Sequence, residues 1–232
     1  MFVERVALSV TVSIIIPVLN EAQSIEKTFS YARDVADEVI VVDGGSTDGT
    51  VEILESLDCV VVNAAKGRGQ QLFAGANVAT GKLLLFLHAD TWLNVDARSQ
   101  LDQCWDASDS KELFCGCFEQ HIVADRLIYR WIEKGNFWRA KFQRLPYGDQ
   151  GVFVSRKLYD AVGGMPQMSL MEDFEFARLI SKRSRLEILP GPIHVDVRRW
   201  EKVGPIRQTI RNWSIALRYR LGVSPEKLVK KY

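Results

Sequence analysis

The first 90 residues of the chain alternate between short β-branched, apolar runs and segments whose apolar side chains recur at helical spacing. The apolar runs predict strands at residues 12–17, 38–43, 59–63 and 83–87. The segments between them predict helices that start near residue 25 and at residues 50–57 and 70–79. Because repeated strand-helix-strand units give parallel strands with covered faces, we expect an α/β fold with a mostly parallel central sheet flanked by helices.

Beyond residue 90 the alternation is less regular. The pattern there predicts helices at residues 96–105 and 171–181, strands at residues 114–120, 152–154 and 193–197, and an amphipathic C-terminal helix at residues 206–221. A length of 232 residues suits one domain, and the sequence contains no internal repeat or linker. We therefore expect a single domain over residues 1–232, built from a regular part (1–92), a less regular part (93–204) and a helical extension (205–232).

The charge balance argues against a nucleic-acid partner. Thirty basic and 29 acidic residues leave a net charge of +1, which gives no strong positive field. The four cysteines form no C-x-x-C pair, so we expect buried, reduced thiols in a cytoplasmic protein and no zinc site.

The apolar N-terminal stretch resembles a signal peptide, but Glu4 and Arg5 interrupt it and no small-residue cleavage site follows. We expect a first strand there instead. No later apolar run approaches the roughly 20 residues that a bilayer-spanning helix needs. The sequence therefore predicts no transmembrane segment, and any membrane contact is expected to be peripheral, at the inner membrane surface.

Acidic side chains follow the predicted strands. Glu21 comes after the first strand, Asp43 ends the second, and His88 and Asp90 come after the fourth. In an open parallel sheet these strand ends meet at one edge, where ligands bind. Carboxylates gathered there repel one another, and a divalent cation together with a donor-rich nucleotide would relieve that repulsion. No G-x-G-x-x-G follows the first strand and the chain holds no P-loop motif, which disfavours dinucleotide dehydrogenases and P-loop enzymes.

Four segments, taken in order, resemble a known family: Ile-Pro-Val-Leu-Asn-Glu at residues 16–21, Val-Asp-Gly-Gly-Ser-Thr-Asp-Gly-Thr at 42–50, Leu-Phe-Leu-His-Ala-Asp at 85–90, and Glu172-Asp173. The chain resembles family 2 glycosyltransferases with the GT-A fold, including compact soluble bacterial members, over most of its length. The resemblance implies transfer of a sugar from a UDP- or GDP-linked donor to an acceptor. Residues 1–92 would then be the nucleotide-binding half and 93–204 the acceptor side.

The resemblance also implies a donor site. Pro17 and Glu21 would line the pocket for base and ribose, and Asp43 would accept a hydrogen bond from the base. Arg68 lies in the glycine-containing segment 66–70, whose backbone can approach a ligand closely and whose guanidinium can contact phosphate through two nitrogens. A solvated turn is the alternative for that segment.

The segment His88-Ala89-Asp90 stands where the family carries an Asp-x-Asp motif, so the resemblance makes Asp90 the expected metal ligand. His88 replaces the first aspartate, and either a donor-binding or a structural role is open to it. His194 is a candidate further ligand, again with a structural role as the alternative. We expect a divalent cofactor, Mn2+ or Mg2+, and a nitrogen-rich site would shift the preference toward Mn2+.

Glu172 and Asp173 open a predicted helix, whose positive end favours acidic side chains. A purely structural role, in which the two carboxylates stabilise the start of the helix, is therefore the alternative. In inverting members of the family, however, an aspartate at this place removes the acceptor proton, so the resemblance makes Asp173, with Glu172 beside it, the expected catalytic carboxylate.

Acceptor-side residues are also implied by the resemblance. Asp149 and Gln150 lie where the family places an acceptor loop. Arg199 and Trp200 close a segment similar to the Gln-x-x-Arg-Trp signature of membrane-bound processive synthases. Asp196 stands in place of the glutamine, which disfavours processive synthesis.

Two aromatic and basic stretches, residues 126–141 and 207–220, are open to two interpretations. They can contact anionic lipid headgroups or a lipid-linked acceptor, or pack on the core with their charges in water. The acceptor is thus a carbohydrate or a lipid-linked molecule, and homo-oligomerisation stays open. Because the first aspartate of the motif is missing, a non-catalytic nucleotide- or glycan-binding module is the alternative function. A nucleotidyltransferase is a weaker one, since the glycine-rich loop it needs is absent.

Overall fold

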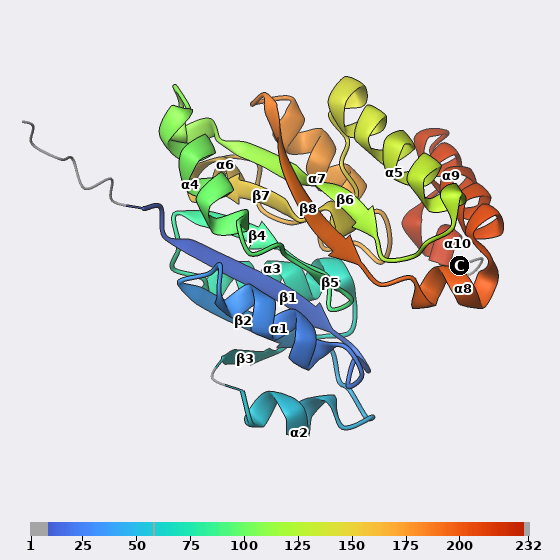
Figure 1. Cartoon of the computed structure of the whole chain (residues 1–232), viewed down its shortest axis with the longest axis horizontal. Helices are drawn as coiled ribbons and strands as arrows, with labels where there is room; N and C mark the ends of the chain where they lie inside the picture. Colours follow the sequence, from blue (N-terminus) through green and yellow to red (C-terminus); the bar gives the residue numbers. More distant parts are fainter. Residues whose placement is uncertain (1–8, 58, 230–232) are drawn as a thin grey trace, which may run out of the picture.

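An eight-stranded sheet runs through the centre of the molecule (Figure 1). The structure is a computed structural model that describes residues 9–57 and 59–229, so Glu4 and Arg5 lie outside the described residues. The strands are β1 (Val12–Val18), β2 (Glu38–Asp43), β3 (Val60–Asn63), β4 (Leu83–Phe86), β5 (Thr91–Trp92), β6 (Cys115–Ile122), β7 (Val152–Ser155) and β8 (Leu186–Val195). Their order in the sheet is β3-β2-β1-β4-β7-β6-β8-β5.

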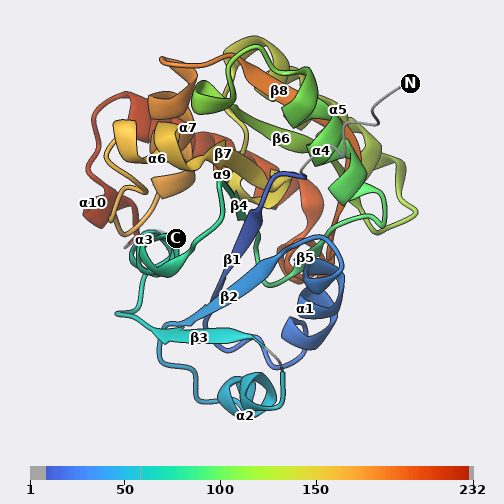
Figure 2. The same cartoon turned by 90° about the vertical axis from the view of Figure 1, so that its left-hand side faces the viewer.

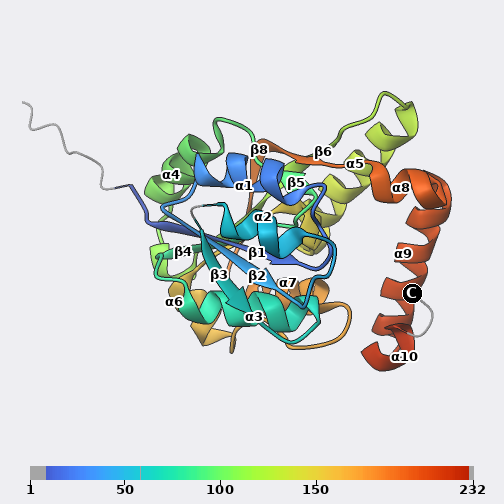
Figure 3. The ribbon, with the colours of Figure 1, turned by 90° about the horizontal axis from the view of Figure 1, so that it is seen from below.

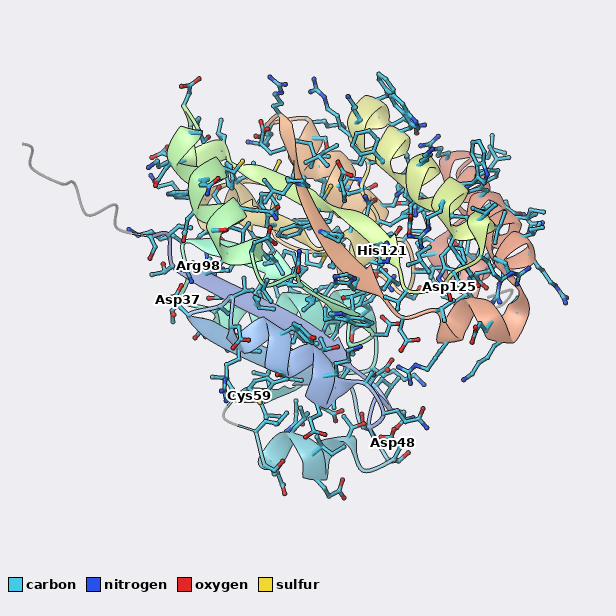
Figure 4. The ribbon with its side chains drawn as sticks, viewed as in Figure 1. Asp37, Asp48, Cys59, Arg98, His121 and Asp125 are labelled. Atoms are coloured by element: carbon cyan, nitrogen blue, oxygen red, sulfur yellow. The ribbon has the colours of Figure 1, made fainter. Side chains whose placement is uncertain are left out.

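The four strands of the N-terminal part pair in parallel, β3 with β2, β2 with β1 and β1 with β4. β6 and β8 are also parallel, whereas β7 runs antiparallel to both its neighbours and β5 antiparallel to β8. Figure 4 shows the strand direction, with Asp37 before β2 at one end of the sheet and Asp48 after it at the other. The residues that follow β1, β2 and β4 therefore meet at the Asp48 end, as parallel pairing requires.

Helices cover both faces of the sheet. They are α1 (Ile25–Arg33), α2 (Thr50–Glu55), α3 (Arg68–Val78), α4 (Ala97–Ala107), α5 (Leu127–Trp138), α6 (Arg156–Ala161), α7 (Glu172–Ser181), α8 (Arg198–Val203), α9 (Pro205–Arg220) and α10 (Pro225–Val229), with short turns η1 (Lys111–Leu113), η2 (Arg139–Gln143) and η3 (Gly148–Gln150). Figure 3 shows α1 and α4 on one side and α3, α6 and α7 on the other.

Each face of the sheet has its own cluster of buried apolar residues. Ile14 and Ile16 of β1 pack with residues of α1 and α4, while Ile15 packs with residues of α3, α6 and α7. Successive side chains of a strand point to opposite faces, so a strand covered on both sides must be apolar throughout. The apolar run from Ile14 to Val18 in β1 is what this layered arrangement needs.

Most predicted elements are present within a few residues of their expected bounds, and the expected α/β sheet is confirmed. β8 is the main difference, because it begins at Leu186, well before residue 193. It passes through Pro190 and Pro192 with a register shift against β6. Proline removes a ladder donor, so a sequence pattern treats this stretch as a break. α5 and α8 lie where no helix is predicted.

The C-terminal helices form one end of the molecule. α9 stands beyond the sheet, with α8 and α10 at its two ends (Figure 3), and α5 packs beside it. Figure 2 shows the edge of the sheet at β3, with α2 beyond it. Among the described residues, no helix has both the length and the apolar character to span a membrane.

Candidate functional site

Two cavities meet where the parallel strands end. The inner cavity, about 150 Å³, lies between the ends of β4 and β8, η3 and the start of α7. The outer cavity, about 650 Å³, is lined by residues that follow β1, β2 and β8. Asp90 and Asp196 line both, so two carboxylates mark their junction. The inner cavity collects six of the predicted site residues, Arg68, His88, Asp90, Asp149, Asp173 and Trp200. The outer cavity collects Glu21 and Asp90.

A tight turn after β4 presents His88 and Asp90. The backbone nitrogen and the hydroxyl of Thr91 both donate to the His88 carbonyl, at 3.1 and 2.9 Å. Thr91 pairs with Val195 across β5 and β8, and the next residue, Asp196, donates its backbone N–H to the Asp90 carbonyl at 3.0 Å. The pairing of these two strands therefore holds the two acidic residues side by side.

Gly148 brings His88 and Asp173 together. A Cβ atom at position 148 would lie 2.6 Å from His88 Nε2 and 3.4 Å from Asp173 Cβ, so a side chain there would collide with the imidazole. The Gly148 N–H donates to Asp173 Oδ2 at 3.0 Å, and the Phe174 N–H donates to Oδ1 at 2.7 Å. These two donors fix the orientation of the Asp173 carboxylate at the cavity wall.

Glu172 plays a different part from Asp173, because it is buried and lies outside the cavity lining. It forms an ion pair with Arg68, which does line the inner cavity. Burial raises the pKa of Glu172, and Arg68 opposes that rise. α3 and the segment before α7 approach closely, since a Cβ at Gly69 would lie 2.4 Å from the Pro166 carbonyl oxygen. Glu172 thus anchors the Arg68 guanidinium beside the cavity.

This ion pair leads to a pH-dependent prediction. In Arg68→Ala the cation that opposes the pKa rise of Glu172 is gone, so the folded state holds the Glu172 proton more tightly than the unfolded chain does. Its contribution to stability then falls as the pH rises. We expect Arg68→Ala to lose little free energy of unfolding at about pH 5 and about 2 kcal/mol at about pH 8, measured by urea denaturation.

The double variant Arg68→Ala/Glu172→Gln is the control, because a neutral amide replaces the buried carboxylate. Its deficit relative to the wild type is expected not to grow between the two pH values, because it has no Glu172 proton to lose. A deficit that also fails to grow with pH in the single variant would contradict this account of the pair.

Asp149 and Gln150 belong to a polar network behind the inner cavity. Asp149 Oδ2 accepts a hydrogen bond from Gln120 Nε2 at 2.8 Å, while Oδ1 is buried and has no hydrogen-bond partner among the described residues. Burial raises the pKa of Asp149, and Arg139 opposes it. Gln150 accepts from Arg139 Nη2 at 2.8 Å and lies outside the cavity lining. Asp149 therefore lines the cavity, whereas Gln150 binds the Arg139 guanidinium outside it.

Pro17 and Asp43 line neither of the two cavities. Pro17 is a β1 residue paired with Val42. The Asp43 carboxylate is buried and accepts hydrogen bonds from the Gly45 N–H at 2.9 Å and from the Ser46 hydroxyl at 2.5 Å. In the structure its oxygens hold the glycine-rich turn after β2.

His194 also lines neither of the two cavities. Its ring stacks on Trp92 with centroids 5.7 Å apart and meets His121 edge-on at 5.5 Å. Burial, with His121 and Lys27 nearby, lowers the pKa of His194. The structure therefore does not bring it together with Asp90 in either cavity.

The two residues of α8 differ in what the structure shows. Trp200 lines the inner cavity, and its ring packs edge-on against Tyr129, with centroids 6.1 Å apart. Arg199 lies in α8, but its side chain is outside the described part of the molecule.

Asp196 is a carboxylate of both cavities that sequence reasoning did not assign to the site. Its Oδ1 accepts from the Arg198 N–H and its Oδ2 pairs with Arg198 Nε, both at 2.8 Å. No clear signal in the sequence marks it, because Asp196 lies inside the strand predicted at residues 193–197, whereas β8 ends at Val195 in the structure.

The donor atoms at the junction fit a divalent cation only in part. Asp90 and Asp196 line both cavities and His88 lines the inner one, but both carboxylate oxygens of Asp196 already accept hydrogen bonds from Arg198. Within the described residues, however, no group of three or more His, Cys, Asp or Glu side chains is placed to hold a metal ion. A cation bound by one or two carboxylates and completed by ligand phosphates needs no larger cluster. The residues present would therefore suit only a metal whose coordination is completed by a ligand.

Comparison with known proteins extends these observations. The family model for glycosyl transferase family 2 matches residues 13–165. A PGL/p-HBAD biosynthesis glycosyltransferase of Mycobacterium bovis is 27% identical over 210 residues, which are 85% of this chain and 79% of that protein. Glycosyltransferase AglJ of Haloferax volcanii is 34% identical over 119 residues, and the match spans 50% of this chain and 36% of AglJ.

Solved structures show the same fold. The mannosyltransferase PcManGT from Pyrobaculum calidifontis, in complex with GDP-Man and Mn2+, superposes with a TM-score of 0.64 at 22% identity, covering 94% of this chain and 66% of that one. S. aureus TarS 1-349 gives a TM-score of 0.64 at 19% identity, covering 80% of this chain and 60% of that one. The chain thus spans about two thirds or less of these two structures. The expected GT-A fold is confirmed, and with more than half of its length matched, the chain belongs to glycosyl transferase family 2.

Proposed function

We propose that the chain transfers a sugar from a UDP- or GDP-linked donor to a hydroxyl of an acceptor, with inversion at the anomeric carbon. The observation that carries the proposal is the placement of Asp173. It lines the same small cavity as Asp90, across Gly148 from His88, and two N–H donors fix its orientation. A carboxylate fixed beside a binding cavity is what a general base requires.

The two cavities would bind different parts of the donor. The nucleotide would occupy the outer cavity beside Glu21, with its diphosphate at the junction marked by Asp90. The sugar would then reach the inner cavity, where Arg68 offers a guanidinium to the phosphates and Asp149 and Trp200 line the wall on the acceptor side. The relative PcManGT, crystallised with GDP-Man and Mn2+, supports this kind of donor.

The reaction is a single displacement. The acceptor oxygen forms a bond to the anomeric carbon, the bond from that carbon to the diphosphate breaks with its electron pair, and the hydroxyl proton moves to Asp173. Asp90, with Asp196 and His88 beside it, would hold a divalent cation, Mn2+ or Mg2+. When bound, such a cation neutralises charge on the departing diphosphate.

The test is a panel of UDP- and GDP-sugars with Mn2+, in which release of free nucleoside diphosphate is measured with and without candidate carbohydrate and lipid-linked acceptors. We expect one nucleotide series to give release that requires the metal and increases with an acceptor. Tight binding of the same nucleotides without any release would contradict transfer, and would favour a binding module with this fold.

A further inference from the structure

The outward face of α9 is apolar. Ile206, Ile210, Trp213 and Leu217 recur at helical spacing and leave between 58% and 62% of their surfaces exposed. Only Pro205 and Ile215 of this helix are buried. An amphipathic helix normally turns its apolar stripe toward the core. Here the stripe faces outward.

A second apolar stripe lies opposite on α5 and η2. Leu127, Trp131, Trp138 and Phe142 share one face of this helix and its continuation, and all four are exposed. The rings of Trp138 and Phe142 stack at 5.0 Å. Apart from Leu127, the residues of the two stripes line the walls of one groove of about 650 Å³ between α5, η2 and α9. An exposed apolar surface of this extent marks an interaction site.

The charges around the groove are basic. α9 contains four arginines and no acidic residue, and α5 with η2 contains one acidic residue, Glu133, which pairs with Arg130 at 2.9 Å. Lys134 and Lys141 lie over the rings of Trp131 and Trp138, at 5.4 and 5.6 Å from their centroids. The two tryptophans therefore have cations over their rings.

We propose that this surface, the α5–α9 face, docks on an anionic lipid bilayer. Tryptophans and aliphatic side chains flanked by lysine and arginine suit the boundary between headgroups and acyl chains. A second copy of the chain fits less well, because pairing two such faces would bring like charges together. Negatively charged headgroups satisfy the cations while the apolar stripes leave water.

The α5–α9 face adjoins the candidate site. Tyr147 and Ala216 line both the groove and the inner cavity. A bilayer docked on this face would therefore lie next to the cavity that holds Asp173, within reach of an acceptor carried by the membrane. The docking itself does not depend on the proposed sugar transfer.

The test is flotation of the full chain with vesicles of phosphatidylcholine alone or mixed with phosphatidylglycerol. We expect binding to the anionic vesicles to exceed binding to the neutral ones by about tenfold or more, and to weaken as salt is raised. The double variant Ile210→Asp/Leu217→Asp is expected to lose this binding by a similar factor. Both positions are exposed, so the fold tolerates the change.

The matched control is Val78→Asp/Val95→Asp, which adds the same charge at exposed apolar positions outside the groove. It should bind vesicles like the wild type. The proposal is overturned if the wild type binds neither vesicle, or if the two double variants bind equally. It is also overturned if the face proves to join two copies, seen as a dimer that Ile210→Asp/Leu217→Asp dissociates while vesicles bind neither form. Donor cleavage, measured separately, tests the proposed function independently of these results.

Discussion

Asp173→Asn is expected to lower the turnover number for sugar transfer by about a hundred- to ten-thousand-fold, while nucleotide affinity stays within a factor of about two. The amide keeps the shape of the carboxylate, and its one carbonyl oxygen can still accept a hydrogen bond from the N–H group of Gly148 or of Phe174, though not from both. It also loses the ability to take a proton from the attacking hydroxyl. The effect should therefore appear in the chemical step and leave binding of the donor unchanged.

The control is Asp160→Asn, an exposed aspartate in α6 outside both cavities, which should retain full turnover. Turnover comes from nucleoside diphosphate release under saturating donor, and affinity from calorimetry. If Asp173→Asn reduced affinity and turnover to the same degree, the residue would be a binding group, and the assignment of the base would be wrong.

The sequence predicts at which edge of the sheet the cavities lie. Parallel strands run in one direction, so their carboxyl ends meet at the same edge. Apolar runs defined β1, β2 and β4, and parallel pairing brings the residues after them to one edge. Glu21 and Asp90 are brought together in this way and line one cavity. No tertiary information beyond the sheet rule is needed for that pair.

Residues from the second half could not be placed by such a rule. Asp173 reaches the cavity because the start of α7 packs against Gly148, a contact between distant segments that no local pattern encodes. Its selection from sequence came from family resemblance.

The end of β8 at Val195 explains why Asp196 lines the cavities whereas the predicted metal ligand His194 does not. Alternation along a strand at residues 193–197 would point His194 and Asp196 the same way. β8 ends at Val195, however, so the alternation stops before Asp196. His194 then packs against Trp92, and Asp196 lines the cavities with Asp90.

The orientation of α9 was likewise beyond the sequence pattern. Helical spacing predicts an amphipathic helix at residues 206–221, and this helix is confirmed. Spacing cannot say whether the apolar stripe meets the core. Only the packing against α5 shows that Ile210 and Trp213 line an open groove.

The second large effect is expected at Asp90. Its carboxylate lies at the junction of the two cavities, where the diphosphate of the donor would bind with a cation. Asp90→Ala removes one of the two carboxylates that line both cavities and leaves Asp196 as the other. We expect the Mn2+-dependent part of nucleoside diphosphate affinity to fall at least about 100-fold. Loss of a residue that only hydrogen-bonds to a metal ligand already weakens metal binding by up to about 100-fold, and loss of the ligand itself should cost no less.

The most direct measurement is calorimetric titration of UDP and GDP into wild type, Asp90→Ala and the exposed-site control Asp109→Ala, each with Mn2+ and with the metal chelated. Thermal unfolding of each variant first establishes that the fold is retained. The account predicts that Mn2+ strengthens binding of one nucleotide to the wild type and the control, and that this gain disappears in Asp90→Ala. An unchanged gain from Mn2+ in Asp90→Ala would contradict the claim that the acidic strand ends hold a cation-bridged diphosphate.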